Sequence, residues 1–380
     1  MNMWCESRNS VKCQKWIALI HRSFYHCKVP CCPVLLNCTR FNKIWMTENV
    51  NDPSDIQVYA ALTPDRMLDA IESTGVDCDG RFLALNSYEN RVYQIGVEGT
   101  VPIVAKFYRP NRWSDEAILE EHQFTQLLAD QEIPVIAPTV DGDGETLHRQ
   151  GAYRFALYPS RGGRAPELDN PDHLEQLGRF VGRIHAFGAT GSFSHRPKID
   201  IESYAVKPRV FLLEKGFIPP HLRVAYETLT ADLVKQIGES FERAGEIRTL
   251  RLHGDCHPGN ILWNEGSAHI VDFDDARTGP AIQDLWMFLS GDRAYMTARL
   301  ADLLEGYTQF FDFNPAELHL VEGLRTMRLI HYAAWIASRW DDPAFPAAFP
   351  WFDTDRYWEE HILMLREQAA LLDEPPLIWD

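Results

Sequence analysis

The stretch that decides the fold runs from Leu250 to Arg277 and reads LRLHGDCHPGNILWNEGSAHIVDFDDAR. Two short apolar runs are separated by the polar turn Asn264-Glu265-Gly266, a pattern typical of a β-hairpin. A loop ending at Asn260 precedes the first run and Asp272 follows the second, so the hairpin brings both residues near Asp255. Three oxygen-bearing side chains at one point suit Mg²⁺, which prefers hard oxygen ligands and keeps phosphate oxygens in its shell. The sequence therefore predicts a magnesium-dependent phosphate site.

The order of these residues also carries a resemblance. The pattern H-G-D-x-x-x-x-N, followed by I-V-D-F-D, is close to the kinase catalytic set H-R-D-x-x-x-x-N and D-F-G. With Gly254 in place of the arginine, the chain from about Met46 to Leu377 resembles the aminoglycoside phosphotransferase and choline kinase superfamily, and within it bacterial Ser/Thr protein kinases of the stress-response type. Further segments that carry the resemblance are LNSYENRVYQ (85–94), AKFYRP (105–110), GPAIQDLW (279–286) and DPAFP (342–346).

The resemblance implies an α+β fold that is protein-kinase-like and two-lobed, with a small antiparallel-sheet N-lobe and a larger helical C-lobe. It implies ATP and Mg²⁺ as cofactors and Ser/Thr residues of proteins as acceptors. In kinase chemistry Asp255 would accept the proton of the attacking hydroxyl and Asn260 would hold the metal. Asp272 would serve both as a metal ligand and as a catalytic residue that bridges Mg²⁺ to the phosphates.

Residues upstream supply the rest of the expected nucleotide site. Lys106 ends a strand in V-A-K, where kinases place the lysine that binds the α- and β-phosphates. The following helix should provide an acid to hold that lysine; helical geometry alone does not choose between Glu120 and Glu121, and we favour Glu121. No G-x-G-x-x-G is present, and the turn with Ser87 occupies its place. The resemblance implies that Ser87 lies at the nucleotide, whereas the alternative is a polar turn without function.

Periodicity and turn signals divide the chain into a strand-rich region and a helical region. We expect an N-terminal nucleotide-binding lobe over 46–158 and a C-terminal catalytic and substrate lobe over 159–380. Strands are predicted at 81–85, 91–96, 101–107, 135–140 and 153–158, with a helix from about Ser114 to Asp130 between them. Pro159–Gly163 is predicted as a linker. Later helices are predicted over 171–187, 221–244, 280–291, 294–312, 315–340 and 355–372.

The charge of the chain limits its partners. With 54 acidic and 37 basic residues, the net charge is −17, which disfavours binding to phosphate backbones, so we expect no nucleic-acid partner. No apolar run has the length that a membrane span needs, so we expect no membrane partner either. Cys78 and Cys256 alone cannot form a disulfide framework, which favours a cytoplasmic protein. We also expect a monomer.

The first 45 residues differ from the rest. They hold six of the eight cysteines and carry a net charge of +6, whereas the remaining residues carry −23. A secretory signal would need a longer apolar core, and a zinc site would need paired C-x-x-C spacing. We interpret 1–45 as a Cys-rich basic extension that is disordered or not native, with translation beginning at Met46.

Three other functions compete with the protein kinase. A small-molecule hydroxyl phosphotransferase acting on a choline-like, aminoglycoside-like or homoserine-like acceptor would use the same metal and base. A two-metal hydrolase could use His253, His257 and Asp274 together with Asp255 and Asp272, but it leaves Lys106 unexplained. A catalytically inactive binding module would not need the polar set. His253 and His185 fit structural roles, Asp284 could brace the catalytic loop, and a second metal at Asp274 and Asp275 is the weaker interpretation.

Overall fold

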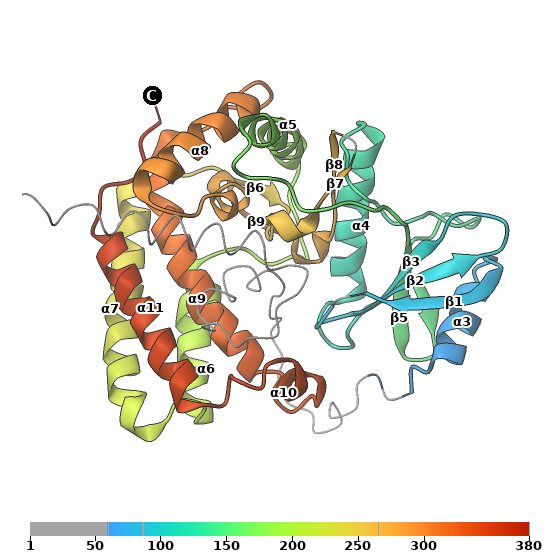
Figure 1. Cartoon of the computed structure of the whole chain (residues 1–380), viewed down its shortest axis with the longest axis horizontal. Coiled ribbons are helices and arrows are strands. Elements are labelled where there is room, and N and C mark those ends of the chain that lie inside the picture. The colour runs from blue at the N-terminus through green and yellow to red at the C-terminus, as the bar shows by residue number, and fades with distance from the viewer. Residues whose placement is uncertain (1–58, 60, 86, 265, 380) are drawn as a thin grey trace, which may run out of the picture. The chain divides into compact units, whose positions relative to one another are not determined.

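A five-stranded antiparallel sheet forms the N-terminal lobe in the computed structural model of the chain (Figure 1). The strand order is β1-β2-β3-β5-β4. The strands are Cys78–Ala84 (β1), Arg91–Val97 (β2), Ile103–Phe107 (β3), His148–Gln150 (β4) and Tyr153–Pro159 (β5). The structure describes residues 59, 61–85, 87–264 and 266–379, so the predicted extension 1–45 and the start of the predicted N-terminal lobe lie outside the described residues.

The register of the sheet decides which way Lys106 points. Lys106 pairs with Val92 on β2 and with Ala156 on β5, so the three side chains share one face. Phe107 alternates to the other face, where it packs in the cluster with Met67 and other residues of helix α3 (Pro64–Glu72). Ala156 instead packs in a cluster with residues of helix α4 (Asp115–Asp130). Lys106 therefore leaves the sheet on the α4 side.

Helix α4 begins and ends where its sequence predicts. Ser114 caps its N-terminus by accepting a hydrogen bond from the Ala117 amide at 3.2 Å, and Asp115 and Glu116 lie in its first turn. Acidic side chains are favourable there because the N-terminal end of a helix dipole is positive. The buried residues of the helix include Glu121. Burying its carboxyl group is unfavourable unless polar or charged partners bind it.

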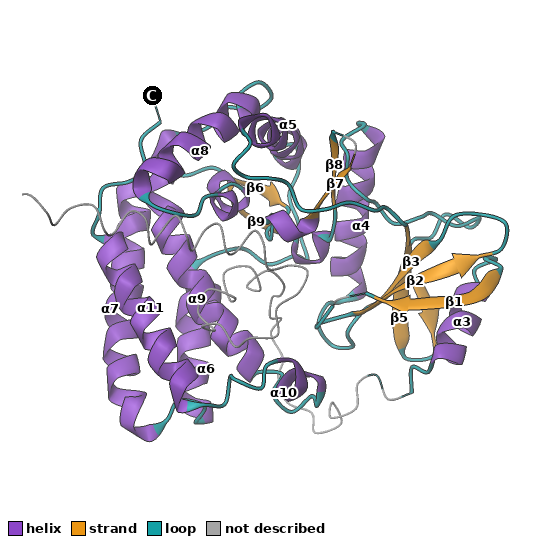
Figure 2. Cartoon of the chain, in the orientation of Figure 1, coloured by secondary structure: helices purple, strands orange, loops and turns teal. Residues whose placement is uncertain are grey.

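The C-terminal lobe is mostly helical (Figure 2). Its helices are α5 (Pro171–Gly188), α6 (Lys207–Lys215), α7 (Pro220–Ala244), α8 (Arg293–Tyr307), α9 (Val321–Ala337), α10 (Ala344–Ala348) and α11 (Asp355–Leu372). Glycines bring α5 and α8 together: a Cβ at Gly178 would lie 1.9 Å from the Leu303 carbonyl oxygen, and one at Gly306 would lie 1.8 Å from that of Glu175. Only glycine allows this backbone approach.

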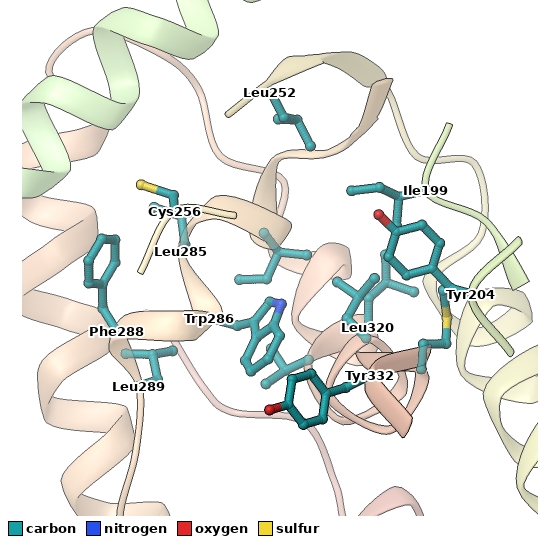
Figure 3. Close-up of a cluster of buried hydrophobic side chains, with 14 of the residues drawn as sticks. Ile199, Tyr204, Leu252, Cys256, Leu285, Trp286, Phe288, Leu289, Leu320 and Tyr332 are labelled. Carbon is teal, nitrogen blue, oxygen red and sulfur yellow. The ribbon is translucent and has the colours of Figure 1, made fainter. Parts of the chain in front are cut away.

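Four short strands and an apolar core support the Leu250–Arg277 segment. Strands β6 (Thr249–Leu252) and β9 (Arg277–Pro280) pair antiparallel, as do β7 (Ile261–Asn264) and β8 (Ser267–Ile270). Figure 3 shows part of the buried apolar core that they share with the helices, including Leu252, Cys256, Leu285, Trp286 and Tyr332. The segment that carries the predicted site is therefore built into the core of the helical lobe.

The fold class is confirmed, and some predicted elements are wrong. Residues 135–140 form no strand of the sheet; β4 pairs with β5 instead, and Val135 makes only an isolated bridge to Ile270. Pro134 and Pro138 lack backbone N–H donors, which a strand inside a sheet needs. The predicted helix 280–291 contains short 3₁₀ turns, and helices α3, α6 and α10 were not predicted.

The helices of the described residues also bear on membrane association. None of them combines the length and the apolar character that crossing a membrane requires. Cys78 and Cys256, the cysteines in the described part of the chain, both carry free thiols.

Candidate active site

The β7–β8 hairpin brings Asn260 and Asp272 together. Ile261 pairs with Ile270, and the Val271 amide donates a hydrogen bond to the Asn260 carbonyl oxygen at 3.0 Å. Asp272 follows with φ 67° and ψ 60°, a left-handed conformation that L-residues other than glycine rarely adopt. Such a conformation costs about 1 kcal/mol or more and tends to be kept at functional sites. It turns the Asp272 side chain out of the hairpin and toward Lys106 of the N-lobe.

Asp255 lies at the start of the loop before β7, and its side chain is buried. Arg328 of α9 places Nη1 2.7 Å from Asp255 Oδ1, and His257 places Nε2 3.5 Å from Asp255 Oδ2. Burial raises the pKa of the Asp255 carboxyl, but Arg328 and His257 together lower it by more, so the pKa is held well below its usual range. Asp255 is therefore an ionised hydrogen-bond acceptor at neutral pH.

Asn260 is held in one orientation. Its Nδ2 donates to the Asp255 carbonyl oxygen at 3.0 Å, which leaves Oδ1 as the acceptor of the amide. Oδ1 of Asn260 and the Asp272 carboxylate are hard oxygen donors of the kind that Mg²⁺ prefers. Within the described ranges, no group of three or more His, Cys, Asp or Glu side chains forms a metal site. The donor set thus fits a metal that takes its remaining ligands from phosphates and water.

Lys106 crosses from the sheet to the helical lobe. Its Nζ lies 3.2 Å from Asp272 Oδ1 and 3.2 Å from Asp274 Oδ1. The ammonium also lies 5.2 Å from the centroid of the Tyr108 ring, within reach of a cation–π interaction. Burial lowers the pKa of Lys106, but Asp274, Glu121 and Asp272 outweigh it and raise the pKa well above its usual value. Lys106 therefore carries a fixed positive charge at the end of the hairpin.

The two glutamates of α4 have different partners. Glu121 is buried, and its Oε2 lies 3.1 Å from Arg196 Nη2. In the described chain Glu121 forms no direct ion pair with Lys106, although its charge raises the pKa of that lysine. Glu120 accepts hydrogen bonds from the backbone amides of Ser194, His195 and Arg196. Of the two candidates, only Glu121 shares its surroundings with Lys106.

The turn that was predicted to cover the phosphates reaches across to α9. Ser87 is half-buried in this turn. Glu89, two residues later, is buried; it accepts from Trp335 Nε1 at 2.8 Å and from Arg339 Nε at 3.0 Å. Asn90 donates to Asp274 Oδ2 at 3.1 Å. The residues that flank Ser87 on its C-terminal side thus fasten the turn to the helical lobe.

Asp284 braces the catalytic loop. Its Oδ2 accepts from the His253 amide and its Oδ1 from the Gly254 amide, both at 2.8 Å. Gly254 has φ 84°, and a Cβ there would lie 2.2 Å from the Asp275 carbonyl oxygen, so no other residue fits. His185 Nε2 contacts the same carboxylate at 3.2 Å, which agrees with its interpretation as a satisfied interior histidine. The Asp284 carboxylate therefore fixes the backbone just before Asp255.

The other candidate residues from the sequence make structural contacts. His253 Nε2 lies 2.9 Å from the Val271 carbonyl oxygen, a structural contact. Asp274 and Asp275 both form ion pairs with Arg112, so these carboxylates already have a cationic partner and a second metal there is disfavoured. The same ion pairs disfavour the two-metal hydrolase. Sequence reasoning missed Arg112, Arg196 and Arg328, because no fixed spacing links them to the motif.

Comparisons of the sequence with known proteins identify the family of the chain. The sequence model of a family described as the phosphotransferase enzyme family matches residues 81–321. The chain is 46% identical over 319 residues to stress response kinase A of Escherichia coli O157:H7, covering 84% of this chain and 96% of that protein. It is 44% identical over 319 residues, with the same coverage, to the serine/threonine protein kinase RdoA of Salmonella typhimurium strain LT2.

Solved structures share the fold at lower identity. The amicoumacin kinase hAmiN in complex with AMP-PNP, Ca²⁺ and Ami superposes with a TM-score of 0.64 at 18% identity, covering 84% of this chain and 96% of that one. A microcompartment-associated aminopropanol kinase superposes with a TM-score of 0.62 at 16% identity, covering 80% of this chain and 98% of that one. These similarities concern the two-lobed architecture.

Proposed function

The chain belongs to the phosphotransferase enzyme family and is an ATP-dependent phosphotransferase, and we propose that it transfers the γ-phosphoryl group of ATP to Ser/Thr hydroxyls of proteins. The protein acceptor is supported by relatives at 44–46% identity whose names include a serine/threonine protein kinase. The observation that carries the chemistry is the convergence of Lys106, Asp272, Asn260 and Asp255 at one end of the β7–β8 hairpin.

The N-lobe sheet offers a surface for the base of the nucleotide. Leu83 pairs with Gln94, and Gln94 pairs with Val104, so these side chains share the face that carries Lys106. Leu83 is 57% exposed, and an apolar side chain so exposed on the edge strand is suited to cover a flat ring. On this proposal the base lies under that face, and the phosphates extend toward Lys106 and the turn with Ser87.

We assign the phosphate end to four residues. Lys106 would bind the phosphates with its ammonium, and Asn260 and Asp272 would hold Mg²⁺ through their oxygens. When bound, the metal would neutralise the charge that develops on the transferred group. Ser87 would contribute its hydroxyl and its turn amides to the phosphates.

Glu121 is assigned to the charge balance around Lys106. Its direct partner is Arg196, and its negative charge acts on Lys106 from within the same buried cluster. The assignment is therefore a supporting one: Glu121 favours the protonated lysine without contacting the phosphates. Glu120, the other candidate for this role, instead accepts hydrogen bonds from the amides of residues 194–196.

Asp255 is assigned to the acceptor hydroxyl. An ionised carboxylate accepts the hydrogen bond of the hydroxyl, aims its oxygen at the phosphorus and takes the proton as the new bond forms. The low pKa makes Asp255 a weak base, which suits a loose transition state that demands little proton transfer before the bond forms. Arg328 and His257 keep the carboxylate in place during this step.

The acceptor is tested by labelling. The protein is incubated with [γ-³²P]ATP, Mg²⁺ and a bacterial lysate, and labelled proteins are separated from labelled small molecules; Asp255→Asn is the matched control. We expect label on Ser/Thr residues of proteins that is lost in the control. Label confined to small molecules would contradict the protein acceptor and favour a small-molecule hydroxyl. The same assay in EDTA and with added Mg²⁺ tests the metal.

The location and the assembly of the protein are also proposals. Free thiols at Cys78 and Cys256 fit a reducing compartment, so we propose a cytoplasmic protein. We also propose that it acts as a monomer. The N-terminal lobe is assigned to 46–158 and the catalytic lobe to 159–380.

A further inference from the structure

Arg196 connects two parts of the proposed nucleotide site. It lies in the segment between α5 and the π-helix Glu202–Val206, and it is 4% exposed. Its Nη1 donates to the Asp274 carbonyl oxygen at 2.7 Å, and its Nη2 lies 3.1 Å from Glu121 Oε2. Its guanidinium carbon lies 4.3 Å from the centroid of the Trp113 ring. One buried cation therefore contacts both α4 and the Asp272–Asp274 segment.

The backbone on either side of Arg196 is fixed to the same helix. Glu120 accepts from the amides of Ser194 at 2.6 Å, His195 at 2.8 Å and Arg196 at 3.0 Å. Consecutive carboxylates of α4 thus hold the backbone and the side chain of one short segment of the helical lobe. A displacement of α4 would have to break these charge-assisted bonds, which are about twice as strong as neutral ones.

We propose that Arg196 is a positioning residue of the nucleotide site: it holds the Glu121 carboxylate and the Asp274 backbone in a fixed relation, so that Lys106 stays aligned on Asp272 and Asp274. Lys106 lies 3.2 Å from both aspartates, and Glu121 adds its charge to the same cluster. The proposal rests on the nucleotide roles given above to Lys106 and Asp272, and it does not depend on the acceptor.

The arrangement also has a consequence for regulation. In protein kinases the position of the equivalent helix and aspartate is controlled by phosphorylation of an activation loop. Only seven residues separate Asp272 from Pro280, and the single hydroxyl among them, Thr278, lies in β9 opposite Arg251. An arginine stays charged at all physiological pH values and needs no modification. Arg196 therefore keeps the site assembled without a phosphate on this segment.

The test compares Arg196→Lys and Arg196→Gln with Arg183→Gln as a matched control. Arg183 of α5 donates a 2.7 Å hydrogen bond to the carbonyl oxygen of Gln131, which follows the C-terminal end of α4, ten residues after Glu121. Four quantities are measured: the Kd for Mg-ADP by calorimetry, KM for ATP, kcat, and the melting temperature. Lysine keeps the charge but loses the planar fork that serves two acceptors.

We expect both Arg196 variants to raise KM for ATP and the Kd for Mg-ADP by about tenfold, as loss of a supporting contact does at other sites. Arg183→Gln should match the wild type. A role confined to stability would instead lower the melting temperature and the active fraction while KM stays unchanged, and that result would overturn the proposal. If Arg196→Gln does not fold, Arg196→Lys decides the question by the same readouts.

Two further variants separate this proposal from the function on which it rests. Lys106→Ala should weaken Mg-ADP binding; if it does not, the nucleotide role of Lys106 fails and this proposal fails with it. Weakened binding in Lys106→Ala with an unchanged Arg196→Lys overturns the present proposal alone. Thr278→Val should keep wild-type kinetics, since no phosphate on Thr278 is needed; a loss of activity reversed by a phosphomimetic Thr278→Glu would overturn the regulatory part.

Discussion

Glu317 should make the stability of the protein depend on pH near neutrality. It is buried, and its Oε2 accepts a hydrogen bond from the Ile282 amide at 2.9 Å. No lysine or arginine of the described residues forms an ion pair with it. Burial raises the pKa of the Glu317 carboxyl from 4.5 to about 7, although the backbone bonds of Ile282 and Ala281 oppose the shift.

The raised pKa of Glu317 determines the direction and the size of the pH dependence of stability. Because the folded protein keeps the proton that the unfolded chain loses, the contribution to stability is full below about pH 4.5 and is lost as the pH rises through about 7. A difference of about 2.5 pKa units corresponds to roughly 3 kcal/mol. Glu317→Gln keeps an oxygen for the Ile282 amide and does not titrate. Relative to the difference below pH 4.5, the variant should therefore exceed the wild type by about 1 kcal/mol at pH 5 and by roughly 3 kcal/mol at pH 8.

Urea unfolding at pH 5, 6, 7 and 8 measures this difference. Subtracting the wild-type free energy of unfolding from that of Glu317→Gln at each pH removes the contributions of all other groups. Glu305→Gln, which changes an exposed glutamate of α8, is the matched control and should give a flat difference. A difference for Glu317→Gln that stays constant within about 0.5 kcal/mol across this range would refute the reasoning.

Three further predictions concern the site. Asp255→Asn keeps the shape of the side chain but cannot take a proton, so kcat should fall by about 10² or more while the Kd for ATP changes little; a kcat within about threefold of wild type would contradict the assignment. Asp272→Ala should abolish Mg²⁺-dependent ATP binding and Asn260→Ala should raise the Mg²⁺ requirement; titrating ATP at several Mg²⁺ concentrations checks both, and an unaltered metal dependence would place the ligands elsewhere. Asp284→Asn replaces one of the two carboxylate oxygens that accept from the His253 and Gly254 amides by an NH₂ donor. One loop amide then loses its acceptor, so the free energy of unfolding should fall by about 3 kcal/mol and kcat should fall as well. Unchanged urea unfolding would show that these hydrogen bonds are dispensable.

The hairpin that carries the site could be predicted because its information is local. Asn260 and Asp272 flank two apolar runs that pair with each other across a short turn, so their proximity follows from the order of residues. The start of α4 could also be predicted, because Ser114 is a favourable N-cap residue and acidic residues follow it. The strand predicted at 135–140 is wrong. The β-propensity of this segment favours a strand, but Pro134 and Pro138 lack the N–H donors that a sheet needs.

The partners of the charged residues could not be predicted in the same way. Arg328 contacts Asp255 from a helix that begins 66 residues later in the chain, and no pattern in the sequence specifies which face of α9 meets the catalytic loop. Arg112 of the N-terminal lobe and Arg196 of the helical lobe likewise meet Asp274 only through tertiary packing. A motif thus names the residues that act on the substrate, whereas the residues that set their charge and orientation come from tertiary packing.

The choice between Glu120 and Glu121 shows where this limit lies. Both residues flank the apolar stripe of α4, and a helix with 3.6 residues per turn places adjacent positions about 100° apart, so either could turn toward Lys106. What separates them is the segment 194–196, which binds the Glu120 carboxylate through three amides and the Glu121 carboxylate through the Arg196 side chain. The identity of the acid near Lys106 is therefore a property of a loop some 75 residues away, as the sequence separation of its bond to Arg196 records.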